Sequence, residues 1–507
     1  MNIKRAKQEI KNTIAAYLFK DAHGEYEIPP MQQRPLLLIG PPGIGKTQIM
    51  EQVARECQIA LVSYTITHHT RQSAIGLPFI SEKEFGGRKR HVTEYTMSEI
   101  VAAVYERMEE TGLTEGILFI DEINCVSETL APAMLQFLQY KTFGTHKIPD
   151  GWVIAAAGNP PEYNKSVREF DIATLDRVKK LEVEADFEVW KEYARQMNLH
   201  SAILSYLTAK PEYFCRLETT VDGKRFATPR GWEDLSKFLG VYEKKGMEAD
   251  REVIAQYLQH DKISRDFANY LELYKRYQAE YQLDKMLCGA CSPGLMERAS
   301  RAEFDERLSI VSLLLSRLET AFRAVGHREE YLELLFEKLK EFRTKSAEDT
   351  AEGALTPLIR FERFLEVFRS EHEKKKKAGL LTRAEDYRFR DVAETLNRYQ
   401  QEARGGSLTD WEAAFGCFSA RFGEERDAYE ALCEEMLKKL EAAFDFMEGA
   451  FGDSQEMVIF ITELNSSYYA VRFLGEYECE RYYRYNKRLL FEEREKGLKG
   501  QLKRLGF

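Results

Sequence analysis

Apolar and polar positions follow two different patterns along the chain, and the first pattern fills the amino-terminal part. Four short apolar runs are separated by segments with helical spacing, and in order they read "PLLLIG", "IALVSY", "GILFID" and "WVIAAAG". Such runs are typical of buried parallel strands, because helices cover both faces of these strands. Strands that alternate with helices predict a doubly wound α/β parallel sheet, which we assign to residues 1–186.

The second pattern begins near residue 187, where strand signals fade and helical spacing takes over. "DFEVWKEYARQM" and "SAILSYLTA" repeat apolar residues at helical intervals, which predicts a small helical lid over residues 187–248. Longer helical patterns such as "AYEALCEEMLKKLEAAFDFMEG" follow, and only two of the fourteen prolines lie beyond residue 229. We therefore expect a large all-α region over residues 249–507.

Composition and charge narrow the class of protein. The 507 residues exceed what one hydrophobic core fills, and 44% hydrophobic with 31% charged residues is typical of a globular protein with a charged surface. The net charge of -10 disfavours a nucleic-acid partner, although it leaves room for a local basic patch. No apolar run could cross a bilayer and no signal-peptide pattern opens the chain, so we expect a cytoplasmic protein without a membrane partner.

Eight cysteines are scattered through the chain. Cys288 and Cys291 in "CGAC" have the spacing of a redox or metal-ligand pair. No second Cys or His pair completes a zinc site, and no strand precedes them as in a thioredoxin motif. The sequence therefore favours ordinary thiols in a reducing compartment over a redox or metal site.

The segment "GPPGIGKT" matches the phosphate-loop pattern G-x-x-x-x-G-K-[ST] in full, directly after an apolar run and before a helical pattern. Glycines let the backbone fold around an anion, and the next helix adds the positive end of its dipole. Lys46 would reach the β- and γ-phosphates, and the Thr47 hydroxyl would take a coordination position of Mg²⁺. The predicted phosphate-binding residues are Gly40, Pro41, Pro42, Gly43, Ile44, Gly45, Lys46 and Thr47.

A pair of acidic residues, Asp121 and Glu122, ends the apolar run "GILFI". In doubly wound sheets the carboxyl end of a strand lies beside the phosphate loop, where Asp121 would hold Mg²⁺, usually through water. Glu122 would then orient and polarise a water for in-line attack on the γ-phosphate. The alternative is two surface acids after a strand, and the phosphate loop upstream favours the catalytic interpretation. A water nucleophile favours a hydrolase over a small-molecule kinase.

Three further polar residues stand where they could contact the same phosphate or a neighbour's. Asn159 follows the apolar run "WVIAAAG" and would hydrogen-bond the attacking water or the γ-phosphate, unless it is only a turn residue before two prolines. Arg177 precedes another strand-like run, and is either a surface arginine or one presented to an adjacent subunit's nucleotide. Arg230 in "FATPRGWEDL" begins a helix of the lid and would reach the γ-phosphate from there.

These motifs, in this order, resemble the AAA+ ATPases and, within them, the MoxR-type group. The resemblance rests on "GPPGIGKT", "ILFIDEIN", "AAAGNP", "LDRV" and "ATPRGW", spans residues 30–240, and includes "HHTRQSAIGLP" after the second strand. It implies that Gly40–Thr47 is the Walker A loop and that Asp121 and Glu122 are the Walker B pair. ATP and Mg²⁺ are the implied substrate and cofactor.

The same resemblance assigns the remaining polar residues. It implies that Asn159 is sensor 1, Arg230 is sensor 2 and Arg177 is the arginine finger, with Arg168 as a second candidate finger. ATP hydrolysis would then require a homo-oligomeric ring, usually a hexamer, because the finger acts on the next protomer's nucleotide. Such a finger is worth about 10³ to 10⁵ in rate among GTPases, so an isolated protomer would be nearly idle.

Partners are also implied by the resemblance. MoxR-type ATPases commonly act with a separate protein that carries a von Willebrand factor A domain. This chain lacks the D-x-S-x-S motif of that domain, so we expect the partner on another chain, docked by helices that resemble no family. Inserted segments at 79–95 and 139–152 are predicted as hairpins that face the ring's opening, with plain surface loops as an equal alternative.

Three functions compete at this point. The favoured one is an ATP-driven remodelling chaperone that strains a protein client through rotation of the lid against the sheet. A nucleic-acid-linked NTPase motor is disfavoured by the acidic balance, and a non-hydrolysing nucleotide-dependent scaffold or switch is disfavoured by Glu122. The client, the ring size, the role of residues 250–507 and the preference for ATP over GTP are left open by the sequence.

Overall fold

A computed structural model describes residues 1–68, 74, 76–143, 145–163, 167, 170–220, 223–348, 357–405 and 411–489. The chain divides into two compact units. The first unit contains Met1–Val189, Thr228–Arg230 and Phe368–Phe389, and the second contains Trp190–Ala227, Gly231–Val367 and Arg390–Phe507. The boundaries expected from the sequence, after residues 186 and 248, stay a prediction.

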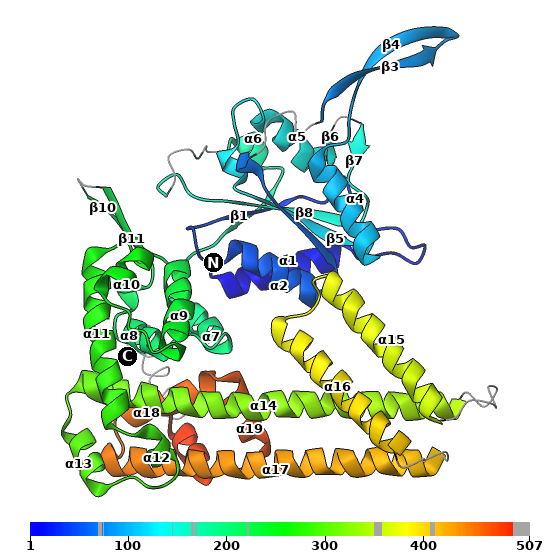
Figure 1. Cartoon of the computed structure of the whole chain (residues 1–507). Helices are drawn as coiled ribbons and strands as arrows, with labels where there is room; N and C mark the ends of the chain where they lie inside the picture. The colour runs from blue at the N-terminus through cyan, green and yellow to red at the C-terminus, as the bar shows by residue number, and fades with distance from the viewer. Residues whose placement is uncertain are drawn as a thin grey trace, which may run out of the picture. The chain divides into compact units, whose positions relative to one another are not determined.

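A five-stranded parallel sheet forms the centre of the first unit, in the order β2-β5-β8-β1-β9 (Figure 1). Its strands are β1 (Leu36–Ile39), β2 (Ala60–Thr65), β5 (Gly116–Asp121), β8 (Trp152–Gly158) and β9 (Lys179–Glu182). The first four are the predicted apolar runs, and β9 is the strand-like run that follows Arg177. Because all five strands are parallel, their carboxyl ends share one edge of the sheet. The phosphate-loop strand β1 lies between β8 and β9.

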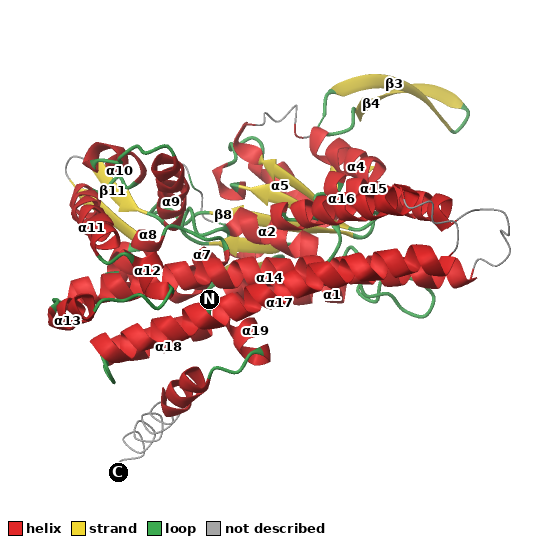
Figure 2. Ribbon diagram, turned by 60° about the horizontal axis from the view of Figure 1, so that its bottom comes forward, coloured by secondary structure: helices red, strands yellow, loops and turns green. Residues whose placement is uncertain are grey.

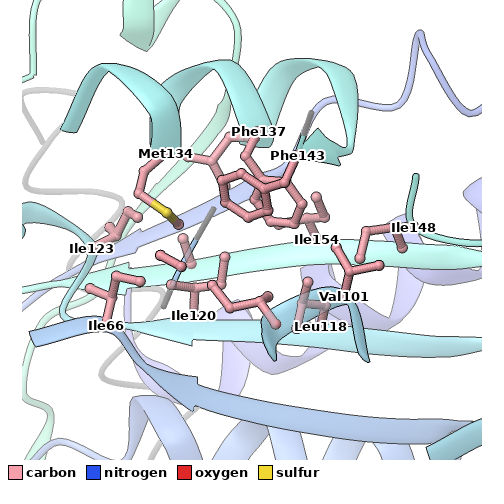
Figure 3. Close-up of a cluster of buried hydrophobic side chains, with 14 of the residues drawn as sticks. Ile66, Val101, Leu118, Ile120, Ile123, Met134, Phe137, Phe143, Ile148 and Ile154 are labelled. Atoms are coloured by element: carbon pink, nitrogen blue, oxygen red, sulfur yellow. The ribbon is translucent and has the colours of Figure 1, made fainter. Parts of the chain in front are cut away.

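Successive residues of each strand point to opposite faces of the sheet, and each face has its own apolar core. Leu118 and Ile120 of β5 face a cluster in which Phe137 stacks on Phe143 with ring centroids 4.0 Å apart (Figure 3). Phe119, which lies between them in the strand, faces the second cluster on the other side. Burial of both faces explains why these strands read as continuous apolar runs in the sequence.

Helices of the first unit supply the outer layers of both clusters. Those that pack on the first cluster are α4 and α5, and those that pack on the second are α1 and α2. The helical elements of this unit are α1 (Ile3–Tyr17), α2 (Lys46–Glu56), η1 (Ile66–His68), α4 (Glu99–Thr111), η2 (Ile123–Cys125), α5 (Ala131–Tyr140) and α6 (Ile172–Leu175). The predicted doubly wound α/β core is therefore confirmed.

Both predicted hairpins are present in the first unit. The longer one pairs β3 (Pro78–Phe85) with β4 (Arg88–Tyr95), and its turn consists of Gly86 and Gly87 as expected. It extends away from the sheet, as Figure 1 shows, and most of its residues are exposed. The shorter hairpin pairs β6 (Thr142–Phe143) with β7 (His146–Lys147). Whether either hairpin faces a ring opening stays a prediction.

The region predicted as a helical lid contains an additional hairpin. Its helices are α7 (Phe187–Gln196), α8 (Ser201–Ala209), η3 (Pro211–Tyr213) and α9 (Pro229–Lys244), and its hairpin pairs β10 (Arg216–Thr220) with β11 (Gly223–Ala227). The expectation that strands end near residue 187 is wrong at this hairpin. Its strands are short and mostly polar, so they lack an apolar run, but the dipeptide "DG" at 222–223 is a hairpin signal in the sequence.

Helices form the rest of the second unit within the described residues, in agreement with the predicted all-α region (Figure 2). The two longest, α14 with 45 residues and α17 with 40 residues, pack along each other. The helices after α9 are α10 (Arg251–Tyr257), α11 (Asp261–Glu280), α12 (Leu283–Leu287), α13 (Pro293–Arg301), α14 (Phe304–Glu348), α15 (Pro357–Lys377), α16 (Arg383–Gly405), α17 (Trp411–Ala450), α18 (Gln455–Ser466) and α19 (Tyr468–Glu476).

The segment Phe368–Phe389, at the end of α15 and the start of α16, belongs to the first unit. Arg107 of α4 donates through Nη1 to the carbonyl of Lys377 (3.2 Å) and through Nη2 to the carbonyl of Ala378 (2.7 Å). Carbonyls at the end of a helix lack partners within it, and a cation also complements the negative end of the helix dipole. Arg107 therefore caps α15.

Other expectations from composition concern membranes, thiols and metals. In the described part of the chain, no helix combines the length and the apolar content needed to span a bilayer. All eight cysteines, Cys288 and Cys291 included, are free thiols. Among the described residues, no group of three or more His, Cys, Asp and Glu side chains is arranged to hold a metal ion.

Candidate nucleotide-binding site

The phosphate loop connects β1 to α2 at the carboxyl edge of the sheet. Gly45 has φ 93°, a left-handed conformation that favours glycine, and it is the N-cap of α2. Lys46 is the first residue of α2 and its side chain turns back along the loop, where Nζ donates to the carbonyls of Gly40 and Pro41, both at 2.8 Å. The loop therefore curves around the ammonium group of its own lysine.

Lys46 is a buried cation whose hydrogen-bond partners are neutral. Its residue is 8% exposed, and its third acceptor is Oδ1 of Asn159 at 2.9 Å. In the described part of the chain, no carboxylate lies within ion-pair distance of this ammonium group. Burial lowers the pKa of Lys46 to about 8; the charges of Asp121 and Glu122 oppose this shift and that of Arg230 adds to it. An anion in the loop would therefore find a cation that is not yet neutralised.

Thr47 and Asp121 come together from different elements. Thr47 Oγ1, in the first turn of α2, donates to Asp121 Oδ2 at the end of β5, at 2.9 Å. The other carboxylate oxygen of Asp121 accepts the backbone N–H of Glu122 at 2.9 Å. This places a hydroxyl and a carboxylate, both oxygen donors of the kind Mg²⁺ prefers, beside the phosphate loop. The two residues predicted to hold Mg²⁺ thus lie within hydrogen-bond distance of each other, and their role as metal ligands stays a prediction.

Glu122 has an unusual backbone. Its φ of 57° and ψ of 33° put a non-glycine residue in the left-handed region, directly between β5 and η2. Such a conformation costs of order 1–3 kcal/mol, and it persists only where the surrounding structure imposes it. The turn takes the chain out of the sheet immediately after Asp121. Glu122 is half-buried rather than freely exposed.

Asn159 is held from two sides, and one of the groups that hold it was not predicted from the sequence. Its side-chain oxygen accepts from Lys46, while its backbone carbonyl accepts from Nδ2 of Asn124 at 2.8 Å. Asn124 is 5% exposed and lies in η2. A Cβ on Gly158 would come within 2.6 Å of Asn124 Oδ1, so a larger residue there would displace the Asn124 side chain. In the sequence, the one feature that could have marked Asn124 as a site residue is its position three residues after Asp121 in "DEIN".

The three arginines differ in where the structure places them. Arg230, the second residue of α9, clusters with the first unit, and the Cβ that Gly43 lacks would lie 3.1 Å from the Arg230 Cβ. Arg177 is exposed between α6 and β9, at the amino end of that parallel strand, and therefore at the edge opposite the phosphate loop. Among the described residues, no interaction joins it to the loop or to the acidic pair. Arg168 lies outside the described residues.

Comparison with protein families gives one match. Residues 36–175 match the model of the "ATPase family associated with various cellular activities (AAA)". The protein contains an AAA ATPase domain. The matched segment begins with β1 and ends with α6, so it contains the phosphate loop, the acidic pair and Asn159, whereas Arg177 and Arg230 lie beyond it.

Solved structures that align with the chain include two further proteins. One is the AAA domain of FIGL-1 in complex with ADP, with 18% identity over 42% of this chain and 64% of that chain, and a TM-score of 0.25. Another is a lysine-to-arginine mutant of RuvB from Thermotoga maritima, with 18% identity over 39% and 53% and a TM-score of 0.24. The chain thus spans less than two thirds of each. No curated protein matches the sequence.

Proposed function

We propose that the AAA domain hydrolyses ATP, and that the chain acts as a ring-forming, MoxR-type ATPase that remodels a protein partner. The observation that carries this proposal is the hydrogen-bonded convergence of the phosphate loop, the end of β5 and the end of β8. Lys46 contacts Asn159, and Thr47 contacts Asp121, although each pair is more than 70 positions apart in sequence. A phosphate-binding loop alone would support nucleotide binding without hydrolysis. The polar residues at the ends of β5 and β8 support the proposal that the bound nucleotide is hydrolysed.

Ground-state binding would rest on the loop and the first turn of α2. Lys46 exchanges its neutral carbonyl partners for phosphate oxygens, and the charge-assisted bonds so formed are stronger than the ones released. Thr47 and Asp121 are the residues whose oxygen atoms fit Mg²⁺. A magnesium ion held there would neutralise charge on the phosphates. Arg230 adds a second cation beside Gly43, from outside the loop.

Glu122 and Asn159 would act on the attacking water. Glu122 accepts a hydrogen bond from this water and increases its nucleophilicity, and Asn159 fixes its position through the side-chain amide. Asn124 is a positioning residue, because it holds the carbonyl of Asn159 without itself belonging to the attacking group. General base catalysis of this kind contributes about 10²- to 10⁴-fold in rate.

Arg177 would complete the site of a neighbouring protomer. Its position at the amino end of β9 is at the wrong edge of the sheet to reach the phosphate loop of its own chain. It is exposed, and Ile172, five residues earlier in the chain and 87% exposed, offers an apolar contact for a second copy. Assembly into a ring, with six copies as the expected number, would bring this edge to the next nucleotide. Arg168 stays the alternative finger.

The proposed remodelling role requires that this chain bind other proteins. A separate partner with a von Willebrand factor A domain and a protein client would bind the helices beyond the AAA domain or its exposed hairpins. Nucleotide-dependent rotation of the lid region would transmit force to them.

The decisive experiment measures ATP turnover of the full chain as a function of its concentration. Turnover per protomer is expected to rise with concentration as rings form, and to fall by about 10²- to 10⁴-fold in Glu122→Gln, with nucleotide binding retained. Arg177→Ala is expected to lose about 10³-fold or more. Arg34→Ala, at the same edge of the sheet and also exposed, is the matched control and should keep full activity.

A mixing experiment tests the action in trans. Lys46→Met protomers supply an intact Arg177, and Arg177→Ala protomers supply an intact loop, so a mixture should regain turnover that neither variant has alone. Concentration-independent turnover, or no recovery on mixing, would contradict the ring. ATP binding without hydrolysis at every concentration would instead indicate a scaffold or switch. A salt-sensitive shift of labelled DNA at physiological ionic strength would indicate a nucleic-acid motor.

A further inference from the structure

The β3–β4 hairpin of the first unit is a small sheet with two open edges. Within the described residues its strands pair with each other and with no other strand, so the outer edge of each keeps unpaired backbone N–H and carbonyl groups. An isolated two-stranded hairpin is at best marginally stable in water, and stability normally requires a further strand or a packed helix. A third strand from another molecule would therefore complete this sheet.

Large apolar side chains of this hairpin are exposed. Five apolar residues on it or directly before it are 39–76% exposed, and these are Leu77, Phe79, Ile80, Phe85 and Tyr95. Because side chains alternate along a strand, Phe79 and Phe85 share one face of the hairpin, while Ile80 and Tyr95 share the other. Single exposed apolar residues are ordinary, whereas several on one element indicate a surface that another molecule covers.

Charge is divided unequally between the two faces. The face of Phe79 and Phe85, which we call the basic face, holds the charged residues Lys83, Arg88, Arg90 and Glu94. With three cations and one carboxylate its net charge is +2, in a chain whose net charge is -10. The other face holds one cation, Lys89, and the carboxylates of Glu82 and Glu84. An acidic partner would therefore approach the basic face.

Two cations of the basic face have no carboxylate partner. Glu94 forms an ion pair with Lys83, whereas among the described residues no ion pair includes Arg88 or Arg90. Both arginines are exposed, and the register places Arg90 directly opposite Lys83. Like charges directly opposite each other across two strands destabilise a hairpin. Carboxylates supplied by another molecule would offset this repulsion.

We propose that the outer edge of β4 binds an extended polypeptide segment that carries acidic and apolar side chains on one face. Backbone hydrogen bonds to the open edge would hold the segment, and every second side chain would reach the basic face. Acidic residues would lie opposite Arg88 and Arg90, and an apolar residue opposite Val92. This inference rests on the proposed remodelling function, because the segment would belong to the protein client or partner.

Other occupants of this edge fit the hairpin less well. A second copy of the chain that paired through the same edge would bring a second face of net charge +2 beside the first. A nucleic acid would supply negative charge, but it has no backbone N–H and carbonyl groups to pair with a strand edge. An acidic polypeptide satisfies the open edge and the unpaired arginines together.

The test measures binding of labelled peptides to the full chain without nucleotide, by fluorescence anisotropy. The probe is an eight-residue peptide, the length of β4, whose alternate positions are two glutamates followed by two valines, with threonine between them. It is made in both chain directions. Saturable binding is expected for at least one direction, and about fivefold weaker binding or less when lysine replaces the glutamates or serine replaces the valines. Labelled oligothymidylate serves as the nucleic-acid probe and should bind more weakly.

Two double variants locate the binding. Arg88→Glu with Arg90→Glu reverses the unpaired charges, so the lysine peptide should now bind more tightly than the glutamate peptide. Arg5→Glu with Arg34→Glu changes the net charge equally at exposed positions outside the hairpin, and it should keep the original preference. A reversal of preference is a gain of binding, which a folding defect would not produce.

Several results would overturn the inference. These are no saturable binding of the glutamate–valine peptides, equal binding of the lysine peptide, tighter binding of oligothymidylate, or an unchanged preference in the Arg88 and Arg90 variant. Self-association of the chain that this variant abolishes would assign the edge to a second copy instead. ATP turnover is measured separately on the same preparations. Peptide binding without turnover would contradict only the ATPase proposal, and turnover without peptide binding would contradict only this inference.

Discussion

Opposite edges of the same sheet each bury a lysine, and the comparison shows what turns a buried charge into a binding site. Lys46 at the carboxyl edge is 8% exposed and Lys141 at the amino edge is 3% exposed. Lys141 donates to Oε1 of Gln33 at 3.0 Å and to the carbonyl of Trp152, the first residue of β8, at 2.9 Å. Burial lowers the pKa of each lysine to about 8. The two lysines are therefore nearly equivalent in their burial, in their neutral hydrogen-bond partners and in their pKa.

Their surroundings differ. Lys141 caps α5 with φ 55° and closes the end of the first apolar cluster, where its acceptors belong to loops and strand ends of the scaffold. Lys46 instead lies beside Thr47, Asp121, Glu122 and Asn159, which approach from three elements. A perturbed lysine is thus weak evidence for function by itself. The convergence of independent polar residues distinguishes the two edges.

The largest effect should come from removing each lysine in turn. Lys46→Met is expected to weaken ATP binding by about 10- to 150-fold, because a charge-assisted hydrogen bond is worth about 1.5–3 kcal/mol. Lys141→Met should leave ATP affinity within about twofold and lower the free energy of unfolding by about 1–3 kcal/mol, since it leaves two buried acceptors unsatisfied. Fluorescent-nucleotide titration and chemical denaturation measure the two quantities. If both variants weakened ATP binding equally, the proposed difference between Lys46 and Lys141 would be wrong.

Asn124 offers a sharper test of the carboxyl edge. Asn124→Ala removes the hydrogen bond to the Asn159 carbonyl, worth about 0.5–1.5 kcal/mol, so kcat should fall by roughly 2- to 10-fold while ATP affinity stays unchanged. Asn12→Ala, on an exposed face of α1, is the control variant and should change neither quantity. Steady-state kinetics and equilibrium binding together separate positioning from a structural defect. A rise in KM with kcat intact would assign Asn124 to binding instead.

Proton linkage should distinguish the lysines in solution. Phosphate oxygens stabilise the charged ammonium group, so bound ATP is expected to raise the pKa of Lys46 from about 8. Near pH 9, binding should then take up a fraction of a proton, and affinity should fall as the pH rises above 8, by at most about tenfold per pH unit. Calorimetry in buffers of different ionisation enthalpy measures this uptake. It should persist in Lys141→Met, and its absence in the unmodified protein would contradict the buried charge.

A last prediction concerns stability at high pH. Between pH 8 and 10.5 Lys141 is largely neutral in the folded chain and protonated in the unfolded chain, so the unfolded state binds more protons. The free energy of unfolding should therefore rise with pH across this window, by about 1–3 kcal/mol relative to Lys141→Met. Urea denaturation of both proteins at pH 7.5 and 10 measures the difference. A difference that shrinks with increasing pH would have the wrong sign.

The carboxyl edge was more predictable than the rest because its chemistry depends on short segments. "GPPGIGKT" and "GILFIDE" specify both residue type and local structure, so the approach of Lys46, Thr47 and Asp121 follows once the strands are parallel. Asn124 was missed because its partner is a backbone carbonyl 35 residues away, which no side-chain pattern encodes. Lys141 was missed because a lysine at the end of an amphipathic helix normally reaches solvent.

The second unit was predictable in class and not in detail. Helical spacing predicted its helices, whereas β10 and β11 were missed because five-residue, mostly polar strands carry no apolar run.

The left-handed backbone of Glu122 has a consequence for how this protein can be altered. Glycine would adopt that conformation without steric cost, so Glu122→Gly removes a local strain of order 1 kcal/mol while it removes the carboxylate. Selection for thermal stability alone would favour Glu122→Gly, and selection for ATP turnover would favour the original glutamate. At residue 122, thermal stability therefore favours glycine and catalytic activity favours glutamate.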